Sequence, residues 1–171
     1  MTRARTIGIG MDHSAASRTA LKWAIENLID AGDTVVVVLV LPSKSDPVNK
    51  KLFLDTGSPL IPLLEFKEID VRKKYGITPQ SQIFDMLDTV SAAKQVKVVA
   101  KVYWGNPRDK LCEAVHYLKL DALVVGSRGL SAIKRVLLGS VSSHVVQKAT
   151  CPVTVVKRTL PISSSDASKQ R

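Results

Sequence analysis

The run from Thr34 to Leu41 constrains the fold more than any other part of this 171-residue chain. It contains one threonine, five valines and two leucines, and Pro42 follows it directly. Branched side chains of this kind favour an extended backbone. Because no polar residue alternates with the apolar ones, both faces of such a strand must be covered. The run therefore predicts a central strand of a parallel sheet that has helices on both faces.

Four further strands flank this central one in the sequence. They are expected at Thr6 to Gly10, Val96 to Tyr103, Leu120 to Val125 and Pro152 to Val156. Helical spacing of apolar residues separates them, with Ser14 and Asn106 as N-caps and a last helix at Ser140 to Ala149. Alternating strands and helices predict a single doubly wound, open, five-stranded parallel sheet of the α/β class.

Three glycines are spaced through the segment that follows the fourth strand, in the pattern Gly126-x2-Gly129-x9-Gly139-Ser140. An apolar strand runs into this loop, and the loop runs into a helix whose first N–H groups lack intrahelical partners. No acidic residue occurs from Ser127 to Ser165, so the local charge favours an anion. The spacing matches neither the P-loop nor the dinucleotide fingerprint. On composition alone, a loop that binds nothing is the alternative, because glycine and serine are ordinary turn residues.

The complete pattern resembles the nucleotide-binding signature of the universal stress proteins, and the resemblance extends from about Arg5 to Lys157. The segment from Pro59 to Leu63 resembles that of plant members. The resemblance implies a Rossmann-like sheet of the adenine nucleotide alpha hydrolase type, with strand order 3-2-1-4-5. It also implies dimerisation through the last strand, Val153 to Lys157, whose apolar edge needs a partner.

The resemblance also implies a site for ATP or AMP, with or without Mg²⁺. Gly10, Met11 and Asp12 would lie at the adenosine portion, and Val40 would contact adenine. Three loop residues would lie along the ribose and the α-phosphate: Gly126, Arg128 and Gly129. Main-chain and hydroxyl donors at the start of the last helix would hold the outer phosphates: Gly139, Ser140, Val141 and Ser142.

The function expected from these residues is that of a nucleotide-binding sensor or scaffold in the stress response. One alternative is a slow ATP hydrolase, which needs a metal and a water-activating base, and Asp12 is the candidate base. Another is a chaperone-like oligomer that binds clients through an exposed apolar insert. No residue set specifies a hydrolytic centre, and the three histidines show no metal-ligand spacing. Neither a catalytic residue nor a metal site is therefore predicted.

Two segments depart from the alternating pattern, and they set the expected domain boundaries. Residues 1–158 are expected to form one domain. Within it, residues 43–78 form a long insert rich in proline and glycine, expected to be mobile, with a short helix near Leu63 to Tyr75. Residues 159–171 are rich in serine and have only Ala167 as an apolar residue after Ile162, and they are expected to be disordered.

The net charge of +10 invites a nucleic-acid partner, but the basic residues are scattered and only 5% of the residues are aromatic. Nucleic acid is therefore not expected as a partner, and no segment is long and apolar enough to cross a membrane. Two cysteines make no disulfide framework, and the N-terminal residues lack the apolar core of a signal peptide. A cytoplasmic location is expected, with the nucleus as an alternative.

Overall fold

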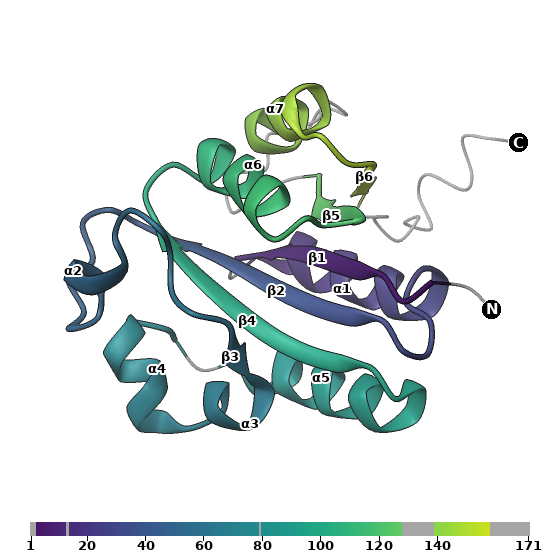
Figure 1. Cartoon of the computed structure of the whole chain (residues 1–171), viewed down its shortest axis with the longest axis horizontal. Helices are drawn as coiled ribbons and strands as arrows, with labels where there is room; N and C mark the ends of the chain where they lie inside the picture. The colour runs from purple at the N-terminus through teal and green to yellow at the C-terminus, as the bar shows by residue number, and fades with distance from the viewer. Residues whose placement is uncertain (1–2, 13, 79, 128–138, 158–171) are drawn as a thin grey trace, which may run out of the picture.

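The computed structural model describes residues 3–12, 14–78, 80–127 and 139–157 (Figure 1). Two predicted site residues, Arg128 and Gly129, and the predicted tail lie outside the described residues. The strands are β1 (Thr6–Met11), β2 (Thr34–Leu41), β3 (Ile61–Pro62), β4 (Lys97–Trp104), β5 (Ala122–Gly126) and β6 (Val153–Val156). The helices are α1 (Ala15–Asn27), α2 (Lys50–Phe53), α3 (Leu63–Phe66), α4 (Ile69–Tyr75), α5 (Ser81–Lys94), α6 (Pro107–Tyr117) and α7 (Ser140–Lys148).

The strands form one sheet in the order β3-β4-β2-β1-β5-β6. All neighbours are parallel except β3 and β4, which are antiparallel. The α/β class is confirmed, and the five predicted strands take the predicted order 3-2-1-4-5. The predicted number of strands is too small by one, because Ile61–Pro62 forms a short edge strand beside β4. Two residues that include a proline carry no strand pattern, since proline has no N–H to donate to a ladder.

Helices cover both faces of the sheet, as Figure 1 shows, and they enclose two separate cores. One core lies under α1 and α5 and takes Val35 and Val37 from β2. The other lies under α6 and α7 and takes Val36 and Val38 from the same strand. Successive side chains of a strand point to opposite faces. The uninterrupted valine run is therefore explained by burial on both sides.

The predicted helix starts are confirmed where a side chain caps them. The Ser14 hydroxyl accepts a hydrogen bond from the N–H of Ser17 at 3.2 Å, at the start of α1. Asn106 accepts one from the N–H of Arg108 at 3.0 Å, at the start of α6. Among the described helices, none combines the length and the apolar surface that a membrane crossing requires.

The insert, residues 43–78, folds into α2, β3, α3 and α4 beside the outer edge of β4. The single helix predicted near Leu63 to Tyr75 is two helices, α3 and α4. Ser58 anchors the insert, because its N–H donates to the carbonyl of Val102 and its hydroxyl accepts from the N–H of Val102, both at 2.8 Å. The mobility of the insert stays a prediction.

An ion pair between the partly exposed Arg5 and the buried Asp33 lies at the amino-terminal end of the sheet. The guanidinium of Arg5 donates to Asp33 at 2.9 Å and to the carbonyl of Leu28 at 2.7 Å. The N–H groups of Arg5 and Asp30 also donate to the Asp33 carboxylate, at 3.0 and 2.9 Å. Burial by itself would raise the pKa of Asp33, but the hydrogen bonds from Arg5 and these N–H groups hold it below its ordinary value. Asp33 thus ties the end of α1 to the starts of β1 and β2.

We expect Asp33→Ala to lower the free energy of unfolding by about 3 kcal/mol at pH 7, because Arg5 and two N–H groups lose a buried acceptor. A lowered folded-state pKa stabilises the fold above the ordinary aspartate pKa of about 4 and loses its effect as the pH falls. The difference between wild type and variant should therefore shrink at pH 3 in urea unfolding curves. Asp30→Ala, which removes a side chain that is 78% exposed, is the matched control with a small effect. An equal difference at both pH values would contradict this account.

Candidate functional site

The candidate site lies where the strand order reverses, between β1 and β5 (Figure 1). From β1 the chain proceeds outward through β2 and β4, whereas β5 and β6 build the other half of the sheet. Met11 pairs with Leu39 on one side, and the pairing of Ile9 with Val124 brings the end of β5 beside it on the other. Ligands of open α/β sheets bind at such a reversal, outside the carboxyl ends of the strands.

Asp12 follows β1 and is exposed at this edge. One oxygen of its carboxylate accepts a hydrogen bond from the N–H of Ser14 at 2.7 Å. The Ser17 hydroxyl donates to the Asp12 carbonyl at 2.9 Å and accepts from the Asp12 N–H at 3.3 Å. These bonds hold the Asp12 main chain against the first turn of α1 while the carboxylate stays accessible to a ligand.

Ser127 and Gly139 bring the two ends of the glycine loop together. The N–H of Gly139 donates to the carbonyl of Ser127 at 2.8 Å, and the N–H of Ser127 donates to that of Val156 at 3.0 Å. The hydroxyl of Ser142 lies within 3.3 Å of the Ser127 carbonyl and 3.1 Å of the Gly139 carbonyl. The loop therefore leaves β5 and enters α7 at one point.

The N-terminus of α7 is open to an anion. Gly139 is the N-cap and has no side chain to accept the first N–H groups, and no acidic residue lies in the first turn. The N–H groups of Ser140, Val141 and Ser142 occupy the first three helical positions, which have no intrahelical acceptor. They carry the positive end of the helix dipole. The arrangement suits phosphate oxygens without any basic side chain.

Gly126 is required for packing inside the protein. A Cβ at this position would lie 2.7 Å from the carbonyl carbon and the carbonyl oxygen of Ala16. A backbone cannot yield as a flexible side chain does, so α1 can approach β5 this closely only because residue 126 is glycine. Close approach to a ligand, the role expected from the sequence, is therefore not the only reason for a glycine at position 126.

The remaining predicted residues differ in what they can offer a ligand. Val40 is partly exposed near the end of β2, beside Tyr103 of β4. Met11 is buried in the core under α1, so its main chain, not its side chain, is available at the edge. Ser142 is 2% exposed, and its hydroxyl proton is directed at the loop carbonyls. The main-chain N–H of Ser142 is therefore the group that remains available to a phosphate.

Ser127 is a site residue that the sequence analysis missed. It is buried, and its main chain joins the loop to both β6 and α7. Only its place directly after Gly126 in the glycine pattern could have indicated this role, because the bonds it makes join residues far apart in the sequence.

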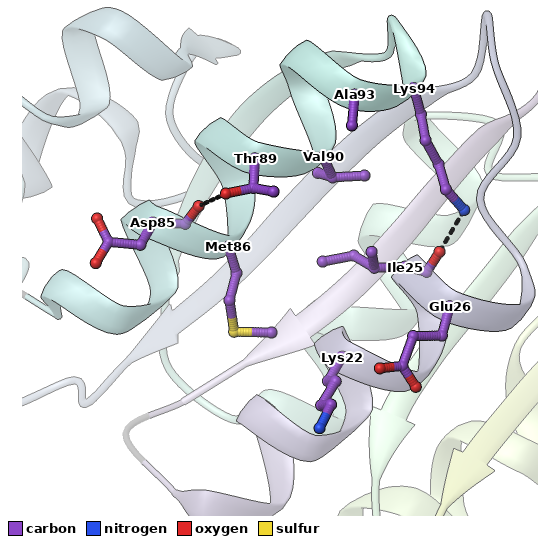
Figure 2. A pocket seen from close by; sticks show the side chains of 9 residues that line it. All are labelled: Lys22, Ile25, Glu26, Asp85, Met86, Thr89, Val90, Ala93 and Lys94. Atoms are coloured by element: carbon purple, nitrogen blue, oxygen red, sulfur yellow. Dashed lines mark hydrogen bonds between the residues drawn. The ribbon is translucent and has the colours of Figure 1, made fainter.

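A separate apolar groove of about 380 Å³ lies between α1 and α5, as Figure 2 shows. Ile25, Met86 and Val90 line it, and charged side chains stand at its rim. Lys94 closes one end by donating to the carbonyls of Ile25 and Ile29. The groove shares no residue with the candidate site.

The described residues contain no group of three or more His, Cys, Asp and Glu side chains that could hold a metal ion. Cys112 and Cys151 are free thiols, and burial raises the pKa of each above its ordinary value. A raised pKa leaves fewer reactive thiolates at neutral pH.

A family model described as "Universal stress protein family" matches residues 3–157, which is nearly the whole chain. The chain belongs to the universal stress protein family. The resemblance seen in the glycine pattern is thereby confirmed.

Relatives within the family come from several kingdoms. Universal stress proteins PHOS32 and PHOS34 of Arabidopsis thaliana are 30% and 29% identical in alignments of 168 positions, each of which covers 90% of this chain. A universal stress protein A family protein of Schizosaccharomyces pombe is 28% identical over 156 residues. The chain spans only 64%, 62% and 45% of these three proteins. The resemblance to plant members stays a prediction, because a fission yeast relative matches about as well.

Solved universal stress proteins share the fold. One from Arabidopsis thaliana, with AMP bound, has a TM-score of 0.57 and 21% identity and covers 95% of this chain and 98% of its own. Another, in complex with cAMP, has a TM-score of 0.55 and 22% identity, with coverages of 91% and 98%. At this identity the likeness shows the fold alone.

The described residues bring most of the predicted site together at one edge of the universal stress protein sheet: Gly10, Met11, Asp12, Val40, Gly126, Gly139, Ser140, Val141 and Ser142. Arg128 and Gly129 belong to the predicted site but lie outside the described residues. That these residues bind a nucleotide stays a prediction.

We expect Gly126→Ala to lower the free energy of unfolding by about 2 to 3 kcal/mol, because the new methyl group meets backbone atoms of Ala16. Gly10→Ala is the matched control, since its methyl group would meet only side-chain atoms of Val125 and Leu111, at 3.1 and 3.3 Å. Urea unfolding of both variants measures the difference. An equal loss of unfolding free energy in the two variants would show that the contact between Gly126 and α1 is not tight.

Proposed function

We propose that this universal stress protein binds an adenine nucleotide, AMP or ATP, and acts as a sensor or scaffold in the stress response. The observation that carries the proposal is the N-terminus of α7, which has no side-chain cap and which the bond between Ser127 and Gly139 holds at the end of β5. The relatives with known ligands support it, since one binds AMP and another binds cAMP. The proposal requires binding and no turnover.

The phosphates are proposed to lie at the start of α7. The N–H groups of Ser140, Val141 and Ser142 would donate to phosphate oxygens, and the Gly139 main chain would line the same end. Arg128 and Gly129 are proposed to lie along the ribose and the α-phosphate. With ATP, Mg²⁺ is proposed to arrive on the triphosphate, because the described residues provide no cluster of metal ligands of their own.

The nucleoside is proposed to lie at the ends of β1 and β2. The Asp12 carboxylate would accept hydrogen bonds from ribose hydroxyls or the exocyclic amine, and the partly exposed Val40 would contact the adenine face. The main chains of Gly10, Met11 and Gly126 would complete the wall. A micromolar affinity needs about 8 kcal/mol, which several charge-assisted donors and one covered base can supply.

We also propose a homodimer through β6 and Lys157. The strand pairs with β5 on one side, and within the described residues nothing pairs with its other edge. An apolar, unpaired edge is a template for another strand. A separate proposal concerns the compartment. Both cysteines are free thiols, so we propose a reducing compartment, either the cytoplasm or the nucleus.

We expect Gly139→Asp to weaken binding of AMP and ATP at least tenfold, because its carboxylate would repel phosphate and occupy the free N–H groups of α7. The backbone of Gly139 (φ −59°, ψ 159°) suits an aspartate N-cap, so thermal stability should not fall. Isothermal titration calorimetry, with and without magnesium, measures the affinity.

Gly139→Ala, which adds a methyl group without charge or capping ability, is the control and should bind more tightly than Gly139→Asp. Wild-type affinity in Gly139→Asp would overturn the phosphate assignment. Small molecules released by denaturing the purified protein should include an adenine nucleotide. Accumulation of ADP from ATP that Asp12→Asn abolishes would instead support the hydrolase alternative.

We expect Thr154→Lys to convert the dimer into monomers at micromolar concentrations, because it places like charges on two strands that would pair at this edge. The side chain is only partly buried, so the fold should survive. Sedimentation velocity gives the mass, and Thr154→Val is the matched control that keeps the dimer. A dimer unaffected by lysine would contradict the interface.

A further inference from the structure

Exposed apolar side chains gather on the insert. The described residues have eight large apolar side chains that are exposed, and six of them belong to residues 43–78: Val48, Leu52, Leu54, Leu60, Leu64 and Ile69. Single exposed apolar residues are ordinary, but a concentration of them marks a surface that another molecule covers. The chemistry around these six residues identifies that molecule.

Helix α4 connects the two halves of the insert. Its last turn contacts the start of α2, because the N–H of Asn49 donates to the carbonyl of Lys74 at 3.0 Å and the rings of Phe53 and Tyr75 stack at 6.2 Å. Its first turn follows α3 after the two residues Lys67 and Glu68. Figure 1 shows α4 between α2 and α3.

The half formed by α2 and the last turn of α4, termed the basic end, is apolar and positively charged. Val48 and Leu52 are 78% and 71% exposed. Five lysines surround them, against the two aspartates Asp46 and Asp55: Lys44, Lys50, Lys51, Lys73 and Lys74. The described residues provide no ion-pair partner for these lysines.

The half formed by α3 and the first turn of α4, termed the acidic end, is its counterpart. Leu64 and Ile69 are 78% and 62% exposed. Three exposed carboxylates surround them: Glu65, Glu68 and Asp70. The one lysine of this half, Lys67, donates to Asp88 at 2.7 Å and is thereby neutralised. The acidic end therefore carries about three negative charges, as many as the excess of the five lysines over the two aspartates at the basic end. Arg72, also in the last turn of α4, is counted at neither end, because its guanidinium lies over the Phe84 ring of α5 at 5.3 Å.

We propose that the insert binds a second copy of the same chain, with the basic end of one copy against the acidic end of the other. Each end presents two exposed aliphatic side chains and a charge that the opposite end complements. A two-fold axis across α4 would make both contacts at once, as in an isologous dimer. Two antiparallel α4 helices would also bring opposite helix-dipole ends together.

This contact is separate from the other sites on the protein. The insert lies at the β3 end of the sheet and β6 lies at the other end, so both surfaces can be occupied in one assembly larger than a dimer. None of the residues involved belongs to the nucleotide site. The inference therefore stands or falls independently of nucleotide binding.

The decisive experiment uses two charge-reversed variants of the full chain, both in the Thr154→Lys background to remove the β6 contact. One is Lys51→Glu with Lys73→Glu, and the other is Glu65→Lys with Asp70→Lys. Each alone presents two ends of like charge and should self-associate at least tenfold more weakly than the parent. An equimolar mixture should regain the parent affinity, because each end of one variant then complements an end of the other.

Sedimentation equilibrium at low ionic strength gives the association constants, and they should fall as salt is added. Circular dichroism confirms that each variant is folded. The control reverses two exposed charges of α1, Lys22→Glu with Glu26→Lys, and should leave the parent association unchanged. A parent that stays monomeric at 1 mM, or a mixture that associates no better than its components, would overturn the proposal and indicate a partner of different chemistry.

Discussion

The close contact between the first turn of α1 and the end of β5 positions both halves of the proposed nucleotide site. Gly126 lets the backbone of Ala16 approach to a distance that no side chain would tolerate. That contact places the turn carrying Asp12, which Ser17 holds, beside the last residue of β5. Ser127 follows immediately, and its main chain determines where α7 begins. One packing contact therefore sets the relation between a carboxylate suited to a nucleoside and N–H groups suited to its phosphates.

A site built mainly from main-chain donors makes few demands on side chains. The N–H groups at the start of α7 would be available to a ligand whichever side chains follow, provided that the helix begins at Gly139. This is consistent with a family whose Arabidopsis members are only about 30% identical to this chain, and with solved structures near 20% identity that keep the fold.

The sequence predicts the sheet well because local pattern and tertiary structure agree there. The valine run of β2 and the alternation of strands with helices are sufficient for the class and the strand order. Features that depend on contacts between distant residues were not predictable. Strand β3 depends on the pairing of Ile61 with Ala100. The hydrogen bond between Ser127 and Gly139 joins the two ends of the glycine loop, and the hydroxyl of Ser142 lies against the same Ser127 carbonyl. The glycine pattern predicts a site but does not reveal that Gly126 is needed for internal packing.

The way Ser58 and β3 cover β4 has a consequence for how the sheet can grow. They lie beside β4, the eight-residue strand Lys97–Trp104, which is almost wholly apolar at its buried positions. While β3 and Ser58 are paired with this edge of β4, another strand cannot be added there. If residues 58–62 were cut away by a protease or shortened in an engineered version, the strand would become a bare template for amyloid-like stacking. The insert thus occupies part of an edge at which another strand could otherwise pair.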